Sequence, residues 1–126
     1  MTIVALIGTI LFALTVILYI LLIFGAPLGE YAMGGQHRIL PTKNRIITTI
    51  ALIIQLFGIV VLLQGGGIIN TCLSTNVIRI ACYVFAVYLS LNVLMNIASK
   101  SKKEKMLMAP LSLIVAACYW ILALEL

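Results

Sequence analysis

Two residues in one short segment have side chains that could exchange protons with a substrate. Glu30 is one of three acidic residues and His37 is the only histidine, and a carboxylate beside an imidazole can act as an acid/base pair. A catalytic zinc normally takes three protein ligands and the sequence has no HExxH pattern, so we predict no metal site and no catalytic residue. The plainer interpretation is that Glu30, His37 and Arg38 hold the segment together by hydrogen bonds and ion pairs. The functional alternative is that, with Arg45, they bind an anionic lipid headgroup or a small metabolite.

Three amide side chains within long apolar runs form a second group. Gln55, Asn92 and Asn96 would be unsatisfied if they faced hydrocarbon, so they should point into a helix bundle. There they would either join helices by hydrogen bonds or line a small polar cavity that opens toward the basic loops and binds a lipid headgroup or polar ligand. No Asp, Glu, Lys or Arg is expected at mid-membrane depth, which argues against a proton-coupled pump. It also argues against the small multidrug-resistance exporters, which depend on a membrane-embedded glutamate.

The elements that must position these residues are transmembrane helices. The chain has 126 residues, of which 64% are hydrophobic and 9% charged, whereas soluble domains are about 25% charged; a water-soluble protein is therefore excluded. Four uncharged runs are each long enough to cross a bilayer, which takes about 20 residues. We predict helices at about residues 2–24, 44–63, 77–98 and 106–124, in one transmembrane domain over residues 1–126. Because the runs lack the alternation of a membrane β-barrel, the predicted fold is an all-α, polytopic four-helix bundle.

On the first and third predicted helices, aromatic and polar residues recur every three or four positions and therefore share one face. They are Gly8, Phe12, Thr15 and Tyr19 on the first, and Phe85, Tyr88, Asn92, Asn96 and Ser99 on the third. On the fourth, we expect Pro110 in the first turn, where its missing N–H costs little, and Tyr119 and Trp120 in the outer aromatic belt.

The connection between the first two predicted helices, residues 25–42, is long for a helical hairpin. It is rich in glycine and proline but also has apolar side chains that can be buried. We therefore expect an ordered segment that re-enters the membrane or follows its surface.

The basic residues are distributed unequally between the two ends of the predicted bundle. Seven of the eight lie in or beside the first and third connections, and Arg79 is the exception. The positive-inside rule then places these connections in the cytoplasm and both termini outside. Because topology and anionic headgroups account for the basic excess, we expect no nucleic-acid partner.

Three cysteines fall toward the predicted outer side. Cys82 and Cys118 lie at comparable depth, so they would be the least implausible disulfide. No CxxC pair is present, and free thiols that act as small hydrophobic side chains are the simpler expectation.

Two loop motifs suggest a family. The first is Gly25-Ala26-Pro27-Leu28-Gly29 followed by Gly34-Gly35-Gln36-His37-Arg38-Ile39-Leu40-Pro41 and Arg45; the second is Leu91-Asn92 and Asn96-Ile97-Ala98-Ser99-Lys100-Ser101, with Glu104, Met108 and Pro110. With these motifs the chain resembles an uncharacterised family of small four-helix integral membrane proteins from Bacillus-like and actinobacterial genomes. The resemblance implies a multi-pass protein of the bacterial cell membrane and no particular activity. It also marks the two cytoplasmic loops as one joint surface.

The leading functional hypothesis is a non-enzymatic accessory or lipid- or small-ligand-binding protein that acts through its basic cytoplasmic loops, without a cofactor. Its expected partners are membrane lipids and either a second copy of the chain or another membrane protein. One alternative is an oligomeric small channel or transporter with a neutral polar path along Gln55, Asn92 and Asn96. The other is a lipid-modifying enzyme that uses Glu30 and His37.

Overall fold

The computed structural model describes residues 2–31, 39 and 41–126, with the side chain of Glu30 left out. In this part of the chain the elements are α1 (Thr2–Ile23), the 3₁₀ turn η1 (Gly29–Tyr31), α2 (Thr42–Gly65), α3 (Thr75–Ile97) and α4 (Lys102–Glu125), and no strand is present. The predicted all-α four-helix bundle is confirmed. His37 and Arg38 lie outside the described residues.

The helix ends follow from local sequence. The Ser74 hydroxyl accepts a hydrogen bond from the Val77 N–H at the start of α3, and the Ser101 hydroxyl accepts one from the Glu104 N–H at the start of α4; serine is a favoured N-cap. Gly25 ends α1 in the left-handed region, with φ of 92°, a conformation that glycine adopts at low cost.

The fourth helix begins earlier than the sequence analysis predicted, at Lys102 rather than near residue 106. The Ser101 cap, with Glu104 three residues later, brings the charged segment into the first turn, as in a capping box. The expectation for Pro110 is therefore wrong, because this residue lies inside α4. Its missing N–H leaves the carbonyl of Met106 without the usual i+4 donor.

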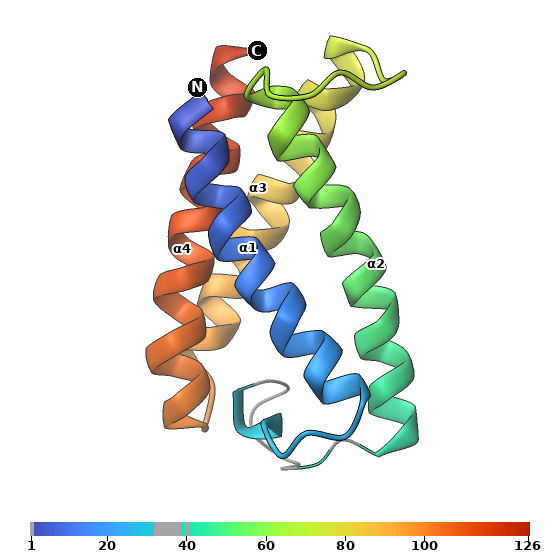
Figure 1. Cartoon of the computed structure of the whole chain (residues 1–126). Helices are drawn as coiled ribbons and strands as arrows, with labels where there is room; N and C mark the ends of the chain where they lie inside the picture. The colour runs from blue at the N-terminus through green and yellow to red at the C-terminus, as the bar shows by residue number, and fades with distance from the viewer. Residues whose placement is uncertain (1, 32–38, 40) are drawn as a thin grey trace.

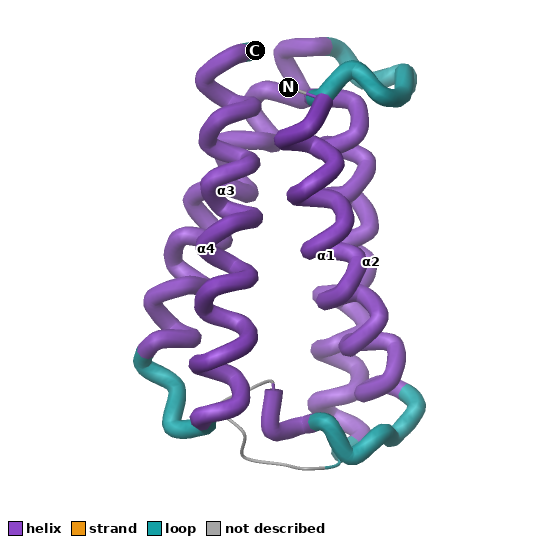
Figure 2. Tube along the Cα trace, turned by 60° about the vertical axis from the view of Figure 1, so that its left-hand side comes forward, coloured by secondary structure: helices purple, strands orange, loops and turns teal. Residues whose placement is uncertain are grey.

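The four helices form two antiparallel hairpins. α1 packs mainly on α2, and α3 mainly on α4; the hairpins join through α1 against α4 and α2 against α3. Both chain termini lie at one end of the bundle, and both hairpin connections lie at the other (Figure 1). The hairpins diverge toward the end with these connections (Figure 2), which we call the loop end.

Halfway along the bundle, three aromatic rings join helices from both hairpins. Phe85 stacks on Tyr119 with ring centroids 5.1 Å apart, and Phe12 meets Tyr119 edge to face at 6.2 Å. The Tyr119 hydroxyl donates a hydrogen bond of 2.7 Å to the Gly58 carbonyl on α2. We call Phe12, Gly58, Phe85 and Tyr119 the aromatic core.

The placement of Tyr119 corrects the expectation of an outer aromatic belt. This side chain is fully buried, because its hydroxyl has a partner inside the bundle and its ring fills the space beside Gly58. Trp120 is half-buried, and its indole N–H donates to the Ser90 hydroxyl on α3 at 3.0 Å.

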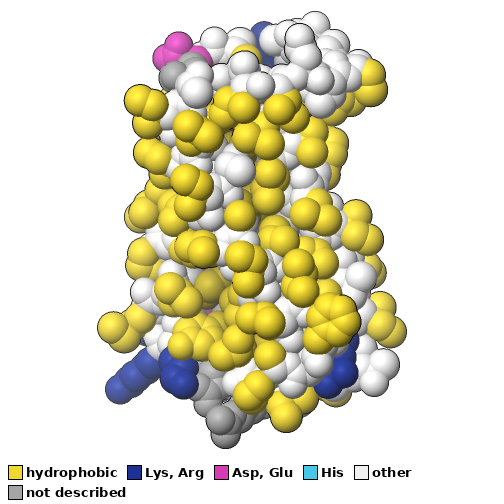
Figure 3. Space-filling model, in the orientation of Figure 1, with side chains coloured by type: hydrophobic (Ala, Val, Ile, Leu, Met, Phe, Trp, Pro, Cys, Tyr) yellow, Lys and Arg dark blue, Asp and Glu magenta, His cyan; other side chains and the backbone are white. Residues whose placement is uncertain are grey.

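The exterior of the bundle is suited to lipid. All four α-helices are long and apolar enough to cross a membrane, so the described part of the chain has the spans of a multi-pass membrane protein. Hydrophobic side chains cover the middle of the visible face, and Lys and Arg gather at the loop end (Figure 3). The three cysteines are all free thiols, with Cys72 exposed and Cys82 and Cys118 buried.

Candidate functional site

A cavity of about 470 Å³ lies between the two hairpins at the loop end. This volume is within the usual range for small-molecule sites. Every helix contributes to its wall, together with η1 and the α3–α4 connection. The described lining residues are Tyr19, Tyr31, Ile47, Thr48, Ala51, Tyr88, Asn92, Met95, Asn96, Ser99, Glu104 and Met108.

Glu104 is the one charged side chain in the described lining. It is 8% exposed, and the Ser99 hydroxyl donates a hydrogen bond of 2.9 Å to its Oε2 atom. The neighbouring lysines 102, 103 and 105 are exposed to solvent. Burial of a carboxylate is costly unless it is hydrogen-bonded, and the Ser99 hydroxyl supplies such a bond.

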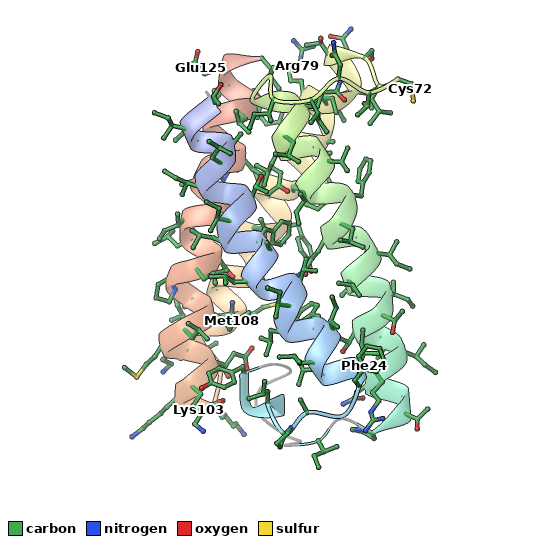
Figure 4. All side chains as sticks on the ribbon, in the orientation of Figure 1. Phe24, Cys72, Arg79, Lys103, Met108 and Glu125 are labelled. Atoms are coloured by element: carbon green, nitrogen blue, oxygen red, sulfur yellow. The ribbon has the colours of Figure 1, made fainter. Side chains whose placement is uncertain are left out.

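Sequence reasoning missed Glu104 as a site residue because it placed this residue in a loop. The usable signal was Ser101 followed three residues later by Glu104, since this spacing is typical of a helix start. A helix that starts at Lys102 places Glu104 and Met108 four positions apart, on one face, and both line the cavity. Figure 4 shows Met108 one turn further into the bundle than Lys103.

Two of the predicted amides converge on a single hydroxyl. Asn92 and Asn96 on α3 donate to the Ser112 Oγ atom on α4 at 3.3 and 3.1 Å. Both amides thus point into the bundle, as the sequence analysis predicts, and both line the cavity. A side-chain amide has two N–H donors, so each asparagine keeps its carbonyl oxygen and a second N–H for other partners.

The third predicted amide, Gln55, lies deeper. It is 8% exposed, and its Oε1 atom is buried without a hydrogen-bond partner in the part of the chain that the structure describes. A void of about 20 Å³ beside it shares Tyr19, Tyr88 and Asn92 with the main cavity. This space is sufficient for one water molecule.

Three tyrosines from three different elements line the cavity: Tyr19 on α1, Tyr31 in η1 and Tyr88 on α3. The Lys103 ammonium lies 5.8 Å from the centroid of the Tyr31 ring, within the range of a cation–π interaction. This contact holds η1 against the start of α4.

An apolar groove of about 240 Å³ lies between α1 and α4, next to the cavity. The two spaces share Tyr31 and Met108. The rest of the groove lining is almost entirely leucine: Leu14, Thr15, Leu18, Leu28, Leu107 and Leu111. The cavity, with its few polar groups, and this apolar groove are thus adjacent.

The other predicted site residues are not in this cavity's described lining. Arg45 lies over Gly25, where a Cβ atom would be 3.1 Å from its Nη2 atom; the guanidinium therefore covers the turn that ends α1. His37, Arg38 and the side chain of Glu30 are outside what the structure describes. Of the seven predicted residues, Asn92 and Asn96 line the cavity and Gln55 lines the adjoining void.

Comparison with protein-family models, curated proteins and solved structures finds no match for this chain. Among the described residues, no group of three His, Cys, Asp or Glu side chains could hold a metal ion. The geometry of the cavity is therefore the basis for a functional proposal.

Proposed function

We propose that this chain is a multi-pass protein of the bacterial cell membrane that binds a small polar molecule or a lipid headgroup between its two hairpins. The observation that carries the proposal is the cavity of about 470 Å³, whose wall combines a buried carboxylate, two amides and three phenols. The amides and the carboxylate bond to Ser112 and Ser99, and they also border a space large enough for a small molecule. In this binding function, Glu30 and His37 take no part in catalysis.

The distribution of charge supports an orientation with the loop end in the cytoplasm. The described bases of that end are Lys43, Arg45, Lys100, Lys102, Lys103 and Lys105. Arg79 lies at the opposite end with Cys72 and Glu125 (Figure 4). By the positive-inside rule, the cavity would then lie at the depth of the cytoplasmic headgroups, where a lipid or a cytoplasmic solute can reach it.

The exposed lining residues indicate where a ligand would enter. Ile47 on α2 is 47% exposed, and Tyr88 and Met95 on α3 are 51% and 70% exposed, so the cavity opens sideways between α2 and α3. In the other direction, the aromatic core fills the bundle beyond Gln55. These features favour binding from the membrane side over passage through one chain, and they weigh against the transporter alternative.

The proposal is tested by filling the cavity. Ala51 is a small lining residue on α2, so Ala51→Phe should exclude a ligand while it adds only apolar volume. Native mass spectrometry of the protein purified in maltoside detergent would detect retained lipids and metabolites. We expect the wild type to retain at least one species that A51F lacks.

The matched control is Ala98→Phe, which makes the same change at an exposed position at the loop end of the bundle. This variant should retain the ligands of the wild type. Identical ligand sets in the wild type and A51F would refute the proposed function.

A further inference from the structure

We propose that the ligand is an amphiphile that carries an ammonium group, with this group in the cavity and a hydrocarbon chain in the groove between α1 and α4. This inference rests on the proposed function and specifies its ligand class. A lipid with an amine or choline headgroup and a single-chain alkylammonium share this chemistry. The argument has three parts: the acceptors of the cavity, its aromatic rings and the adjoining groove.

Several polar atoms of the described lining can accept hydrogen bonds from a cation. Glu104 supplies a carboxylate, whose two oxygens can accept from several donors at once, among them the Ser99 hydroxyl. Asn92 and Asn96 each donate one N–H to Ser112, and their carbonyl oxygens can accept from a cation. Gln55 lines the small void next to the cavity, and its Oε1 atom has no partner among the described residues. None of the Lys and Arg residues that the structure describes lines the cavity.

The aromatic rings complement these acceptors. The face of a tyrosine ring attracts cations through its quadrupole, and clustered rings are a known means of binding quaternary ammonium groups. Tyr19, Tyr31 and Tyr88 reach the cavity from three elements. The Lys103 ammonium over Tyr31 shows that one of these rings already lies against a cation.

The apolar groove accounts for the remainder of the ligand. It shares Tyr31 and Met108 with the cavity, and six of its eight lining residues are leucine or methionine. Leu14 and Leu107 are about half exposed, so the groove is open to the lipid phase. An amphiphile whose head occupies the cavity can therefore have its chain in this groove, against the lipid phase.

Glu104 also has a structural role, because it stands three residues after the Ser101 cap. The test must separate that role from ligand binding. Glu104→Gln keeps a residue that capping boxes accept and nearly the same shape, while it removes the charge. Glu125→Gln makes the same change at the exposed opposite end of α4 and is the matched control.

The experiment measures lipid binding by native mass spectrometry with phosphatidylethanolamine, phosphatidylcholine and phosphatidylglycerol of identical acyl chains. All three carry a phosphate, but only the first two carry an ammonium. We expect the wild type and E125Q to bind those two at least about tenfold more tightly than phosphatidylglycerol, and E104Q to lose this preference, since a hydrogen bond to a charged group is worth about a factor of ten or more. Equal or stronger binding of phosphatidylglycerol by the wild type, or an unchanged preference in E104Q, would overturn the inference.

A second pair of variants decides the result if E104Q does not fold. Tyr88→Phe keeps the ring face at a half-exposed position, whereas Tyr88→Leu removes it. We expect Y88L to bind phosphatidylcholine about three- to fivefold more weakly than Y88F. Equal binding by the two variants would contradict a cation–π role for this ring.

A third arm tests the groove with dodecyltrimethylammonium and tetramethylammonium, which differ only in the alkyl chain. The longer ion should bind more tightly; equal affinity would overturn the assignment of the groove. Each of these negative results leaves the proposed function standing as long as A51F removes a ligand. If A51F and the wild type bind all lipids alike, both proposals fail together.

Discussion

At the scale of single residues, Gly25 and Arg45 show how a basic side chain predicted for ligand binding instead covers a turn. Gly25 has φ of 92°, and a Cβ atom at this position would lie 3.1 Å from Arg45 Nη2. The guanidinium lies where α1 ends and its last carbonyls carry the negative end of the helix dipole, which favours a cation. Arg45 therefore ties the start of α2 to the end of α1.

This arrangement predicts that Gly25→Ala destabilises the protein more than Gly67→Ala. Both glycines have positive φ, 92° and 75°, but Gly67 has no atom within 4 Å of a built Cβ. Each alanine should cost about 1–2 kcal/mol for the left-handed backbone, and only G25A also displaces Arg45. Unfolding in mixed micelles, followed by circular dichroism, measures the difference.

Arg45→Ala provides the control for that comparison. In this background the two glycine substitutions should have similar costs, because the side chain that G25A displaces is absent. Equal costs already in the wild-type background would show that Arg45 moves aside freely and does not support the turn.

At the scale of elements, one hydroxyl on α4 accepts two hydrogen bonds from α3. Ser112 is 2% exposed and accepts from both Asn92 and Asn96. Ser112→Ala leaves two amides without that acceptor, and hydrogen bonds between membrane helices contribute about 0.6–1.7 kcal/mol each. We expect a loss of about 1–3 kcal/mol in the free energy of unfolding.

Ser90→Ala is a suitable comparison, because Ser90 accepts one interhelical hydrogen bond, from the Trp120 indole. It should cost about half as much as S112A in the same unfolding measurement. A cost for S112A no greater than for S90A would show that the two asparagines find other partners.

The helices themselves were largely predictable from the sequence, because bilayer thickness sets a length that uncharged runs must match. The start of α4 was not predicted, because a run of lysines was interpreted as a loop. A serine cap and the snorkelling of long basic side chains allow such a run to begin a helix instead. This shift of the helix start brought Glu104 into the cavity and Pro110 into the helix interior.

The candidate site was predicted in part, and for a geometric reason. Spacing places Tyr88, Asn92, Asn96 and Ser99 on one face of the predicted third helix, and the structure turns that face toward the cavity. Spacing does not determine how far apart two helices stand, so the cavity volume and the contribution of Tyr31 could not be derived from it. Arg45 was grouped with ligand-binding residues because charge alone does not show which neighbour a side chain covers.

At the scale of the whole molecule, the two ends of the bundle differ in packing. Toward the termini, Val61, Leu62 and Leu122 are completely buried and the hairpins are in close contact. Toward the loop end the hairpins diverge, as Figure 2 shows, and both the cavity and the groove lie there. A ligand between the hairpins would therefore be bound on one side of the membrane, and the orientation of the chain decides which side.

The proposed orientation predicts the labelling of native and introduced thiols in intact cells. Cys72 is exposed at the end with the termini, while Cys82 and Cys118 are buried, so a membrane-impermeant maleimide should label the wild type from outside and should not label Cys72→Ala. Adding Lys102→Cys to that variant puts an exposed thiol at the loop end, which should react only after the cells are permeabilised. The reverse pattern would place the basic end outside, and the cavity would then bind its ligand from the outer leaflet.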